Sequence, residues 1–123
     1  MSALESTLAQ FGQSLSLPGL ELNESGVAVM EIEDYGRIYL ERHRNGLVML
    51  LLREITGADL RHYTKALSLC DPREKLPFQP LAALRSPREL VLGFYFEEAS
   101  VTVPALQQAL EELGRLHDQV AAN

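Results

Sequence analysis

Apolar residues recur every three or four positions at both ends of the chain, which is the spacing of amphipathic helices. Near the start, Ser2 followed by Glu5 has the spacing of a capping box, and Pro18-Gly19 stops any continuation. We therefore predict a helix over residues 3 to 15, whose apolar positions are Leu4, Leu8, Phe11 and Leu15. A second helix, over residues 103 to 121, follows from Pro104 near its start and from a longer stripe that comprises Leu106, Ala109, Leu110, Leu113, Leu116, His117 and Val120.

Between residues 26 and 55 the pattern changes to alternation, which is typical of β-strands. Three strands are predicted, within "GVAVMEIE", "GRIYLERH" and "LVMLLLREI", joined by the short turns "DYG" and "RNG". The third strand is apolar on both faces until Arg53, so both of its faces must be covered. One helical layer covers one face, and the other needs a second layer or another subunit.

A third helix is predicted over residues 57 to 70, with Thr56 and Asp59 as candidate caps. Its expected apolar face comprises Leu60, Tyr63, Leu67 and Cys70. Four of the six prolines then break regular structure, although a short edge strand fits residues 81 to 84. The stretch "ELVLGFYFEE" alternates clearly and predicts one more half-buried strand. The expected fold is thus α+β, one domain over residues 1–123, in which helices pack on a twisted antiparallel sheet.

Composition and charge exclude several classes of function. The formal charge is −6, and lysine and arginine are scattered, so a protein that binds nucleic acid through phosphates is not expected. No apolar run approaches the roughly 18 residues of a membrane span, and the first ten residues do not resemble a signal peptide. The single cysteine, Cys70, cannot form an internal disulfide. We therefore expect a cytoplasmic protein without a membrane span.

Candidate catalytic chemistry is sparse. His43, His62 and His117 fall on three different elements, and His62 and Cys70 are two helical turns apart, too far to touch along one helix. The acidic residues that follow two of the strands are expected to be solvated, and their spacing matches no calcium loop; they are Glu31, Glu33, Asp34, Glu97 and Glu98. No nucleotide-binding or hydrolase motif is present. The sequence therefore predicts neither an enzyme nor a cofactor or metal site.

The stretch "FGQSLSLPGLELNESGVAVMEIED", residues 11 to 34, resembles the N-terminal signature of class I type III secretion chaperones, the CesT/SycE-like family. The matching features are Phe11-Gly12 at a helix end, a Leu-Pro-x-Leu-x-Leu segment from Leu17 to Leu22, an acidic turn that ends at Gly26, and the acidic strand end up to Asp34. Asn23 and Ser16 depart from the residues more usual there. The C-terminal "ASVTVPALQQALEELGRLHDQV" is further similar to the SycN-type branch of the family, whose members act with a second chaperone on a secretion gatekeeper.

This resemblance implies the element order α-β-β-β-α-β-β-α, with about five strands and three helices. It also implies a bacterial, cytoplasmic, ATP-independent chaperone that works as a dimer, either with itself or with a second chaperone. Such a protein binds an extended segment near the N-terminus of a secreted effector or gatekeeper and keeps it soluble. Carried to this chain, the family's dimer contact falls on Tyr63, Leu67, Leu81 and Leu84, and its client contacts on Leu8, Phe11, Leu20, Val29 and Tyr39.

Two other hypotheses remain open at this point. The chain could be an α+β adaptor with no role in secretion, or a small-molecule enzyme or binder of unknown type. A gene for a secreted protein beside this one would favour the chaperone over the adaptor. Activity that is lost in His117→Ala or Glu33→Ala, with folding intact, would favour the enzyme.

Overall fold

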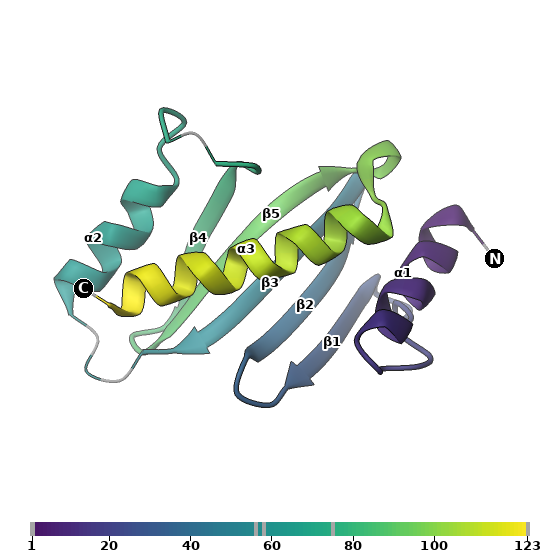
Figure 1. Ribbon diagram of the computed structural model, residues 1–123, viewed down its shortest axis with the longest axis horizontal. Coiled ribbons are helices and arrows are strands. Elements are labelled where there is room, and N and C mark those ends of the chain that lie inside the picture. Colours follow the sequence, from purple (N-terminus) through teal and green to yellow (C-terminus); the bar gives the residue numbers. More distant parts are fainter. Residues whose placement is uncertain (1, 56, 58, 75, 123) are drawn as a thin grey trace.

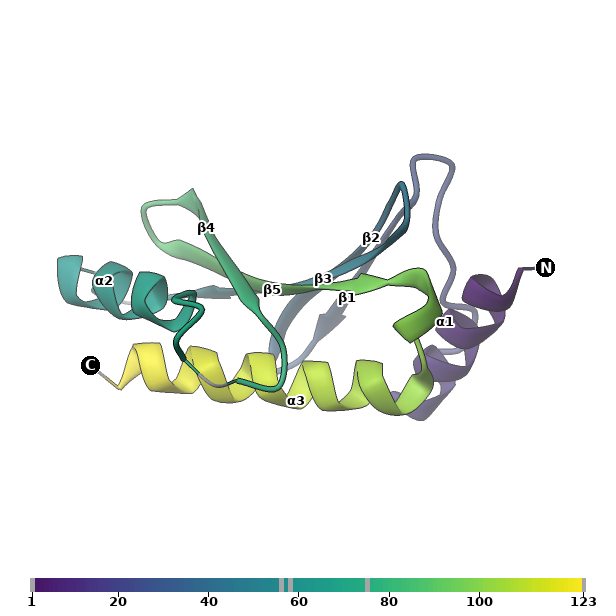
Figure 2. The ribbon, with the colours of Figure 1, turned by 90° about the horizontal axis from the view of Figure 1, so that it is seen from above.

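The computed structural model describes residues 2–122 except for 56, 58 and 75, and shows a curved antiparallel sheet with its long helix on one side. In Figure 2 the C-terminal helix runs beneath the sheet, and the two shorter helices lie at its two ends. The β2–β3 and β4–β5 hairpins rise away from the long helix, so the sheet curves towards its other face. The described part of the chain places no helix on that other face (Figure 2).

The five strands have the spatial order β1-β2-β3-β5-β4, and all neighbours pair antiparallel. The order along the chain, α-β-β-β-α-β-β-α, confirms the predicted fold class. Strands β1 and β4 form the two edges. The strand bounds are Val27–Ile32 for β1, Gly36–His43 for β2, Gly46–Glu54 for β3, Pro80–Ser86 for β4 and Glu89–Glu97 for β5.

The three helices begin where the sequence supplies a capping side chain. Helix α1 spans Ala3–Ser14, α2 Leu60–Leu69 and α3 Val103–Ala121, and a short 3-10 turn, Glu98–Ser100, precedes α3. The side chains of Ser2, Asp59 and Thr102 each accept a backbone N–H from the first turn of their helix, which is the usual function of these residue types. The second candidate cap of α2, Thr56, lies outside the described residues.

The core lies between α3 and one face of the sheet, here called the covered face. Alternate residues of β5, Leu90, Leu92, Phe94 and Phe96, point into it together with Leu47, Met49 and Leu51 of β3. The whole apolar stripe predicted for α3, including His117, is buried. Helix α1 adds Leu4, Leu8 and Phe11, so this core occupies only one side of the sheet.

The apolar face predicted for α2 is not the face that packs on the core. The buried residues of α2 are His62, Ala66 and Leu69, whereas Leu60 and Leu67 are exposed. Two stripes run along this helix, and the structure packs the one formed by His62, Ala66 and Leu69 towards α3 and β4. The prediction failed because helical spacing identifies a stripe but does not say what covers it.

The turn between β1 and β2 is tied to α3 by one aromatic side chain. The hydroxyl of Tyr35 donates to the backbone oxygen of Leu110, and the ring lies over Gly114, where a Cβ would approach the Tyr35 Cζ to 2.8 Å. Arg53 of β3 stacks on the ring with its guanidinium 4.9 Å from the centroid. It also donates to the backbone oxygen of Tyr35 at 2.5 Å and to Asp118 at 2.8 Å. These contacts hold the sheet against one face of α3.

We predict that Gly114→Ala destabilises the protein, although alanine normally favours a helix by up to about 1 kcal/mol over glycine. The added methyl group displaces the Tyr35 ring, and we expect a net loss of about 1–2 kcal/mol in the free energy of unfolding. Urea denaturation measures it. The control is Gly114→Ala in a Tyr35→Ala background, where the methyl group meets no ring. An equal effect in both backgrounds would contradict the predicted clash.

Candidate functional site

A shallow apolar groove of about 150 Å³ lies between α2 and the edge strand β4. We call it the α2–β4 groove, and its lining is almost entirely apolar. The phenol of Tyr63 closes one end by donating to the backbone oxygen of Pro87 in the β4–β5 turn. The lining residues are Tyr63, Ala66, Leu67, Ala82, Ala83, Leu84 and Leu90.

Two leucines that line the groove, one on α2 and one on β4, are exposed to solvent. Leu67 is 67% exposed and Leu84 is 49% exposed, and they line the same groove from different elements. Single exposed leucines need no explanation, but adjacent ones on a helix and a neighbouring sheet edge make the groove a candidate partner surface. Leu60 is still more exposed, at 76%, but it does not line the groove.

The second surface is the face of the sheet opposite α3, here called the open face. A cross-strand row runs over all five strands on this face, because each residue is paired with the next. Val29 at one end is 54% exposed. The row consists of Val29, Tyr39, Leu50, Gly93 and Leu81.

The centre of the open face is closed over by its own side chains. A Cβ on Gly93 would lie 2.7 Å from the backbone oxygen of Met49 and 3.2 Å from Leu81 Cδ1, so a glycine is needed for the leucines to fold over β5. Val48 and Leu52 on this face of β3 are almost fully buried. The sequence correctly indicated that β3 is buried on both sides. On the open face, however, curvature and neighbouring side chains bury it, since no helix of the described residues lies there.

Three of the four residues predicted for a dimer contact lie together. Tyr63, Leu67 and Leu84 line the α2–β4 groove, although they come from segments about twenty residues apart. Leu81 does not join them, because it pairs with Gly93 and points to the open face, whereas Leu84 pairs with Leu90 on the covered face. The places of these four residues do not test whether the protein forms a dimer.

The five residues predicted for client contacts are scattered. Leu8 and Phe11 are fully buried in the core, so neither can contact a client in this conformation, and we exclude both from the proposed binding surface. Leu20 is half-buried and lines a separate hollow beside α1. Only Val29 and Tyr39 are neighbours, paired across β1 and β2 on the open face. The sequence did not point to Leu50, Gly93 or Arg85, which belong to the same face.

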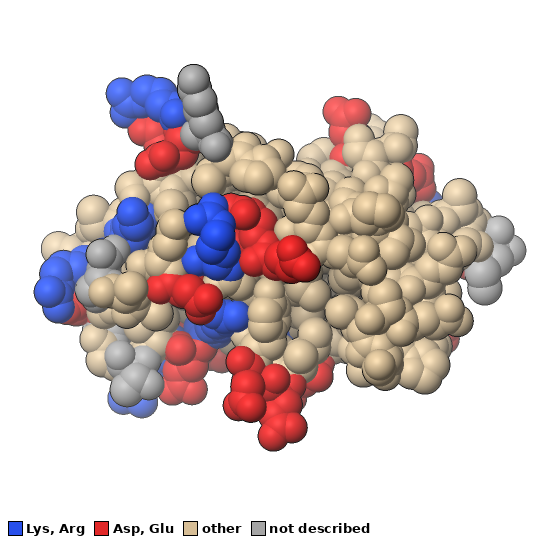
Figure 3. Space-filling model, in the orientation of Figure 1, with Lys and Arg blue, Asp and Glu red and all other residues tan. Residues whose placement is uncertain are grey.

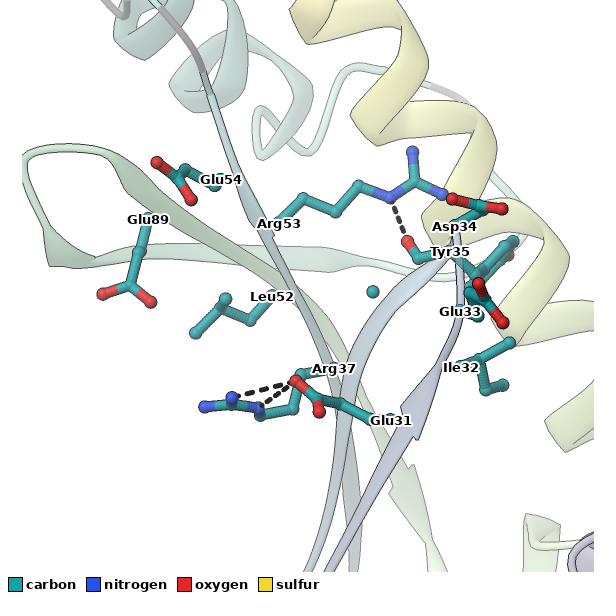
Figure 4. A pocket seen from close by; sticks show the side chains of 11 residues that line it. Glu31, Ile32, Glu33, Asp34, Tyr35, Arg37, Leu52, Arg53, Glu54 and Glu89 are labelled. Atoms are coloured by element: carbon teal, nitrogen blue, oxygen red, sulfur yellow. Dashed lines mark hydrogen bonds and ion pairs between the residues drawn. The ribbon is translucent and has the colours of Figure 1, made fainter.

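A hollow of about 740 Å³ at the β1–β2 turn is lined by five acidic side chains (Figure 4). Its carboxylates come from separate elements and do not converge: Glu54 and Glu89 stand on one side, and Asp34 and Glu33 on the other (Figure 4). Glu31 is neutralised by Arg37, with N···O distances of 2.9 and 3.1 Å. In the part of the chain that the structure describes, no three metal-ligating side chains form a group that could hold an ion.

The histidines and the cysteine show no arrangement for catalysis. His62 accepts the backbone N–H of Asp59 and completes the cap of α2. Burial raises the pKa of the Cys70 thiol, so Cys70 is a weak nucleophile. His117 lies beneath the sheet with Nε2 2.7 Å from the backbone oxygen of Leu51, and His43 is exposed. The three histidines therefore form no catalytic set with one another.

Charge is unevenly spread over the helical face of the molecule. In Figure 3, charged side chains gather over the half that carries α2 and the C-terminal part of α3, whereas the half over α1 is almost free of them. Within the described residues, none of the helices is both long and apolar enough to cross a membrane.

These features define a class of small α+β proteins that present apolar surfaces to other polypeptides. Residues 3–121 match the family described as the type III secretory system chaperone SycN, and the chain belongs to that family. It is 30% identical over 123 residues to the chaperone protein SycN of Yersinia enterocolitica, with 99% of each chain covered. The SycN of Yersinia pseudotuberculosis is equally similar. The family consists of chaperones and not of enzymes, which confirms the predicted class.

Solved structures with the same fold include other secretion chaperones. The Yersinia pestis chaperone SycH, solved with a fragment of YscM2, superposes with a TM-score of 0.75 at 18% identity and covers 96% of this chain and 99% of its own. The chaperone–effector complex HopA1–SchA gives 0.70 at 19% identity, with 92% and 91% covered. YbjN from E. coli, a candidate transcription regulator, gives 0.62 at 14% identity, with 95% and 90% covered. Because the same fold occurs there, the fold alone does not define the function.

We predict that acid weakens the fold through His117. Burial lowers its pKa to about 4, below the ordinary value of 6.5, so the unfolded chain binds the proton more readily. The contribution of His117 to the free energy of unfolding is complete above pH 6.5. It is lost as the pH falls towards 4, and the whole loss is about 3 kcal/mol. Urea denaturation across this range measures it, with His117→Gln as a non-titrating control. Parallel pH profiles of the two proteins would contradict the prediction.

Proposed function

We propose that this protein is a cytoplasmic bacterial chaperone that dimerises and holds an extended N-terminal segment of a secreted effector or gatekeeper. The observation that carries the proposal is that large apolar side chains stay exposed in two places: in the α2–β4 groove, and at the edges of the open face, where Val29 and Leu81 lie. Membership of a type III secretion chaperone family gives these surfaces their role. Nothing in this role requires a cofactor, because binding alone keeps a client segment soluble.

The α2–β4 groove is the proposed dimer contact. It lies beside an edge strand, and its leucines come from two elements, so a second subunit can cover both at once. Its lining is apolar, which suits the centre of a stable interface better than a transient polar contact does. A second copy of this chain or a related chaperone fits the same surface, and the mass and composition of the purified complex distinguish the two.

The open face and the edge strand β1 are the proposed client surface, in which Val29 and Tyr39 take part. An extended client can pair with an edge strand while its alternate side chains reach apolar positions on the sheet. Ordering a flexible segment opposes binding, so a long contact surface is required. Related chaperones of this fold have been solved with an effector or with a partner fragment, which supports the proposal. Leu20, in its separate hollow, is proposed as a peripheral contact.

The central experiment is purification of the tagged protein from its native host, followed by identification of any bound polypeptide. We expect a secreted protein, and we expect its N-terminal region, produced separately, to bind the purified chaperone. A soluble protein that binds no secreted protein's N-terminal region would overturn the proposal, and it would favour the adaptor hypothesis.

Val29→Glu should weaken client binding without changing the dimer. It places a charge at the exposed apolar end of the row, and we expect a loss of about 10–100-fold in affinity, measured by calorimetry with the identified N-terminal region. Gln119→Glu adds the same charge on the exposed side of α3 and serves as the control. Unchanged affinity in Val29→Glu would remove β1 from the client surface.

Leu67→Asp should abolish dimerisation, because it buries an unpaired charge in the groove contact. We expect at least about a 100-fold weaker dimer, from a cost of about 3 kcal/mol or more. Leu60→Asp is the matched control: it lies on the same helix, is more exposed and lies outside the groove. Light scattering that shows an intact dimer for Leu67→Asp would exclude the groove as the contact.

A further inference from the structure

Two arginines converge on one tyrosine hydroxyl on the open face. Nη1 of Arg85 donates to the hydroxyl oxygen of Tyr39 at 3.0 Å, and Nη1 of Arg37 lies 3.5 Å from the same oxygen. Tyr39 occupies the second position of the cross-strand row, next to the exposed Val29. The surface proposed to receive a client thus contains two guanidinium groups that share one hydroxyl.

The contact between Arg85 and Tyr39 crosses the open face. Arg85 lies on the edge strand β4, and Tyr39 lies on β2, with β5 and β3 between them. Because neighbouring strands are about 4.8 Å apart, the two backbones are separated by roughly three strand spacings. The side chains therefore meet above the inner strands, over the side of the sheet where Leu50 and Gly93 lie. Together they form a strap, defined here as the Arg85–Tyr39 pair.

The two arginines differ in their charge balance. Arg37 is paired with Glu31, with an N···O distance of 2.9 Å, and hydrogen bonds to Tyr39 and Glu31 raise the pKa of its guanidinium. Arg85 has no carboxylate within 4.0 Å among residues 2–122 other than 56, 58 and 75. Among the described residues, its side-chain hydrogen-bond partner is the neutral phenol of Tyr39, and a hydrogen bond to a carboxylate is roughly twice as strong as one to a neutral acceptor.

We propose that Arg85 anchors a carboxylate side chain of the client segment. On binding, Arg85 releases the Tyr39 hydroxyl and takes the client carboxylate as its hydrogen-bond partner. Apolar side chains of the client then cover the row from Val29 to Leu81. This deepens, and rests on, the proposed client-binding function. The strap shields the apolar face when no client is bound, and it opens without breaking an ion pair. Arg85 and Tyr39 are specificity-determining residues, since a lysine at the same client position would meet the unpaired guanidinium and be repelled.

The carboxylates of the open face flank the row along the strands. Glu41 lies at the next pair on one side, and Glu54 and Glu89 pair with each other farther along on the other side. Arg85 lies between Leu84 and Ser86, the latter paired with Glu89, and its side chain reaches from there to Tyr39. Because Arg37 is already paired with Glu31, Arg85 is the arginine at Tyr39 that remains available to a client carboxylate.

The test uses three nine-residue peptides as probes, acetylated and amidated at their ends, with leucine at positions 3 and 7 and serine elsewhere. Position 5 is Glu, Gln or Lys, so the three side chains lie on one side of an extended peptide. Binding to the isotope-labelled, full-length chain is followed by NMR titration of the Leu50 and Gly93 amides and the Arg85 side-chain N–H. We expect the Glu peptide to bind about 3–10-fold more tightly than the Gln peptide, and the Lys peptide to bind most weakly.

Two variants separate the strap from general electrostatics. Arg85→Gln should abolish the preference for Glu, whereas Arg88→Gln, an exposed arginine in the β4–β5 turn, should retain it. Tyr39→Phe removes the competing acceptor, so it should retain the preference and bind the Glu peptide at least as tightly as the natural protein does. The preference should also shrink as salt is raised, because an exposed pair is screened.

Several results would overturn the proposal: equal affinities for the Glu and Gln peptides, an undiminished preference in Arg85→Gln, or no shift of the Leu50 and Gly93 amides by any peptide at millimolar concentration. The proposed chaperone function is judged separately, by the secreted protein that co-purifies and by Val29→Glu. If client binding persists and the peptides show no preference for Glu, only the strap is wrong. If no secreted protein binds, the chaperone function fails as well.

Discussion

One long helix can cover only one face of a five-stranded sheet, and both the core and the partner surfaces depend on that constraint. Helix α3 buries a continuous stripe against the covered face. Helices α1 and α2 pack at the ends of the sheet, so the described residues place no second helical layer on the opposite face (Figure 2). The opposite face must therefore be curved, shielded by its own side chains or covered by another polypeptide. In this protein the face is curved and shielded by its own side chains, and the proposed client would cover it.

The position of α2 follows from the same constraint. At the end of the sheet, it packs inward with His62, Ala66 and Leu69, which leaves Leu67 to face outward beside β4. Leu67 therefore remains available to a neighbour. The link through Tyr35, Arg53 and Asp118 holds the other elements against α3. The sheet's shape is thus largely set by the chain itself, before any partner binds.

Much of the fold could be predicted because the strands and helices have clear periods and good caps. The strands around "DYG" and "RNG", and the stripe of α3, match the structure within one or two residues. Less of the candidate site could be predicted from the sequence. Periodicity grouped Leu8 and Phe11 with an apolar stripe, yet could not tell that the core fills it. In β3, where both faces are apolar, alternation does not say which side is open, and only the pairing register joins Tyr39 to Leu50 and Gly93.

Arg85 shows most clearly why local sequence could not reveal the proposed client surface. It follows Leu84 in a proline-rich stretch, and nothing near it in the sequence suggests a tyrosine forty-six residues earlier as its partner. The contact exists because β4 and β2 flank the same two inner strands and the sheet curves towards the open face. A cation held over apolar side chains by a neutral hydroxyl can be released at low cost. The arrangement therefore suits a surface that must remain shielded when empty and yet accept a polypeptide, which a closed hydrophobic core could not do.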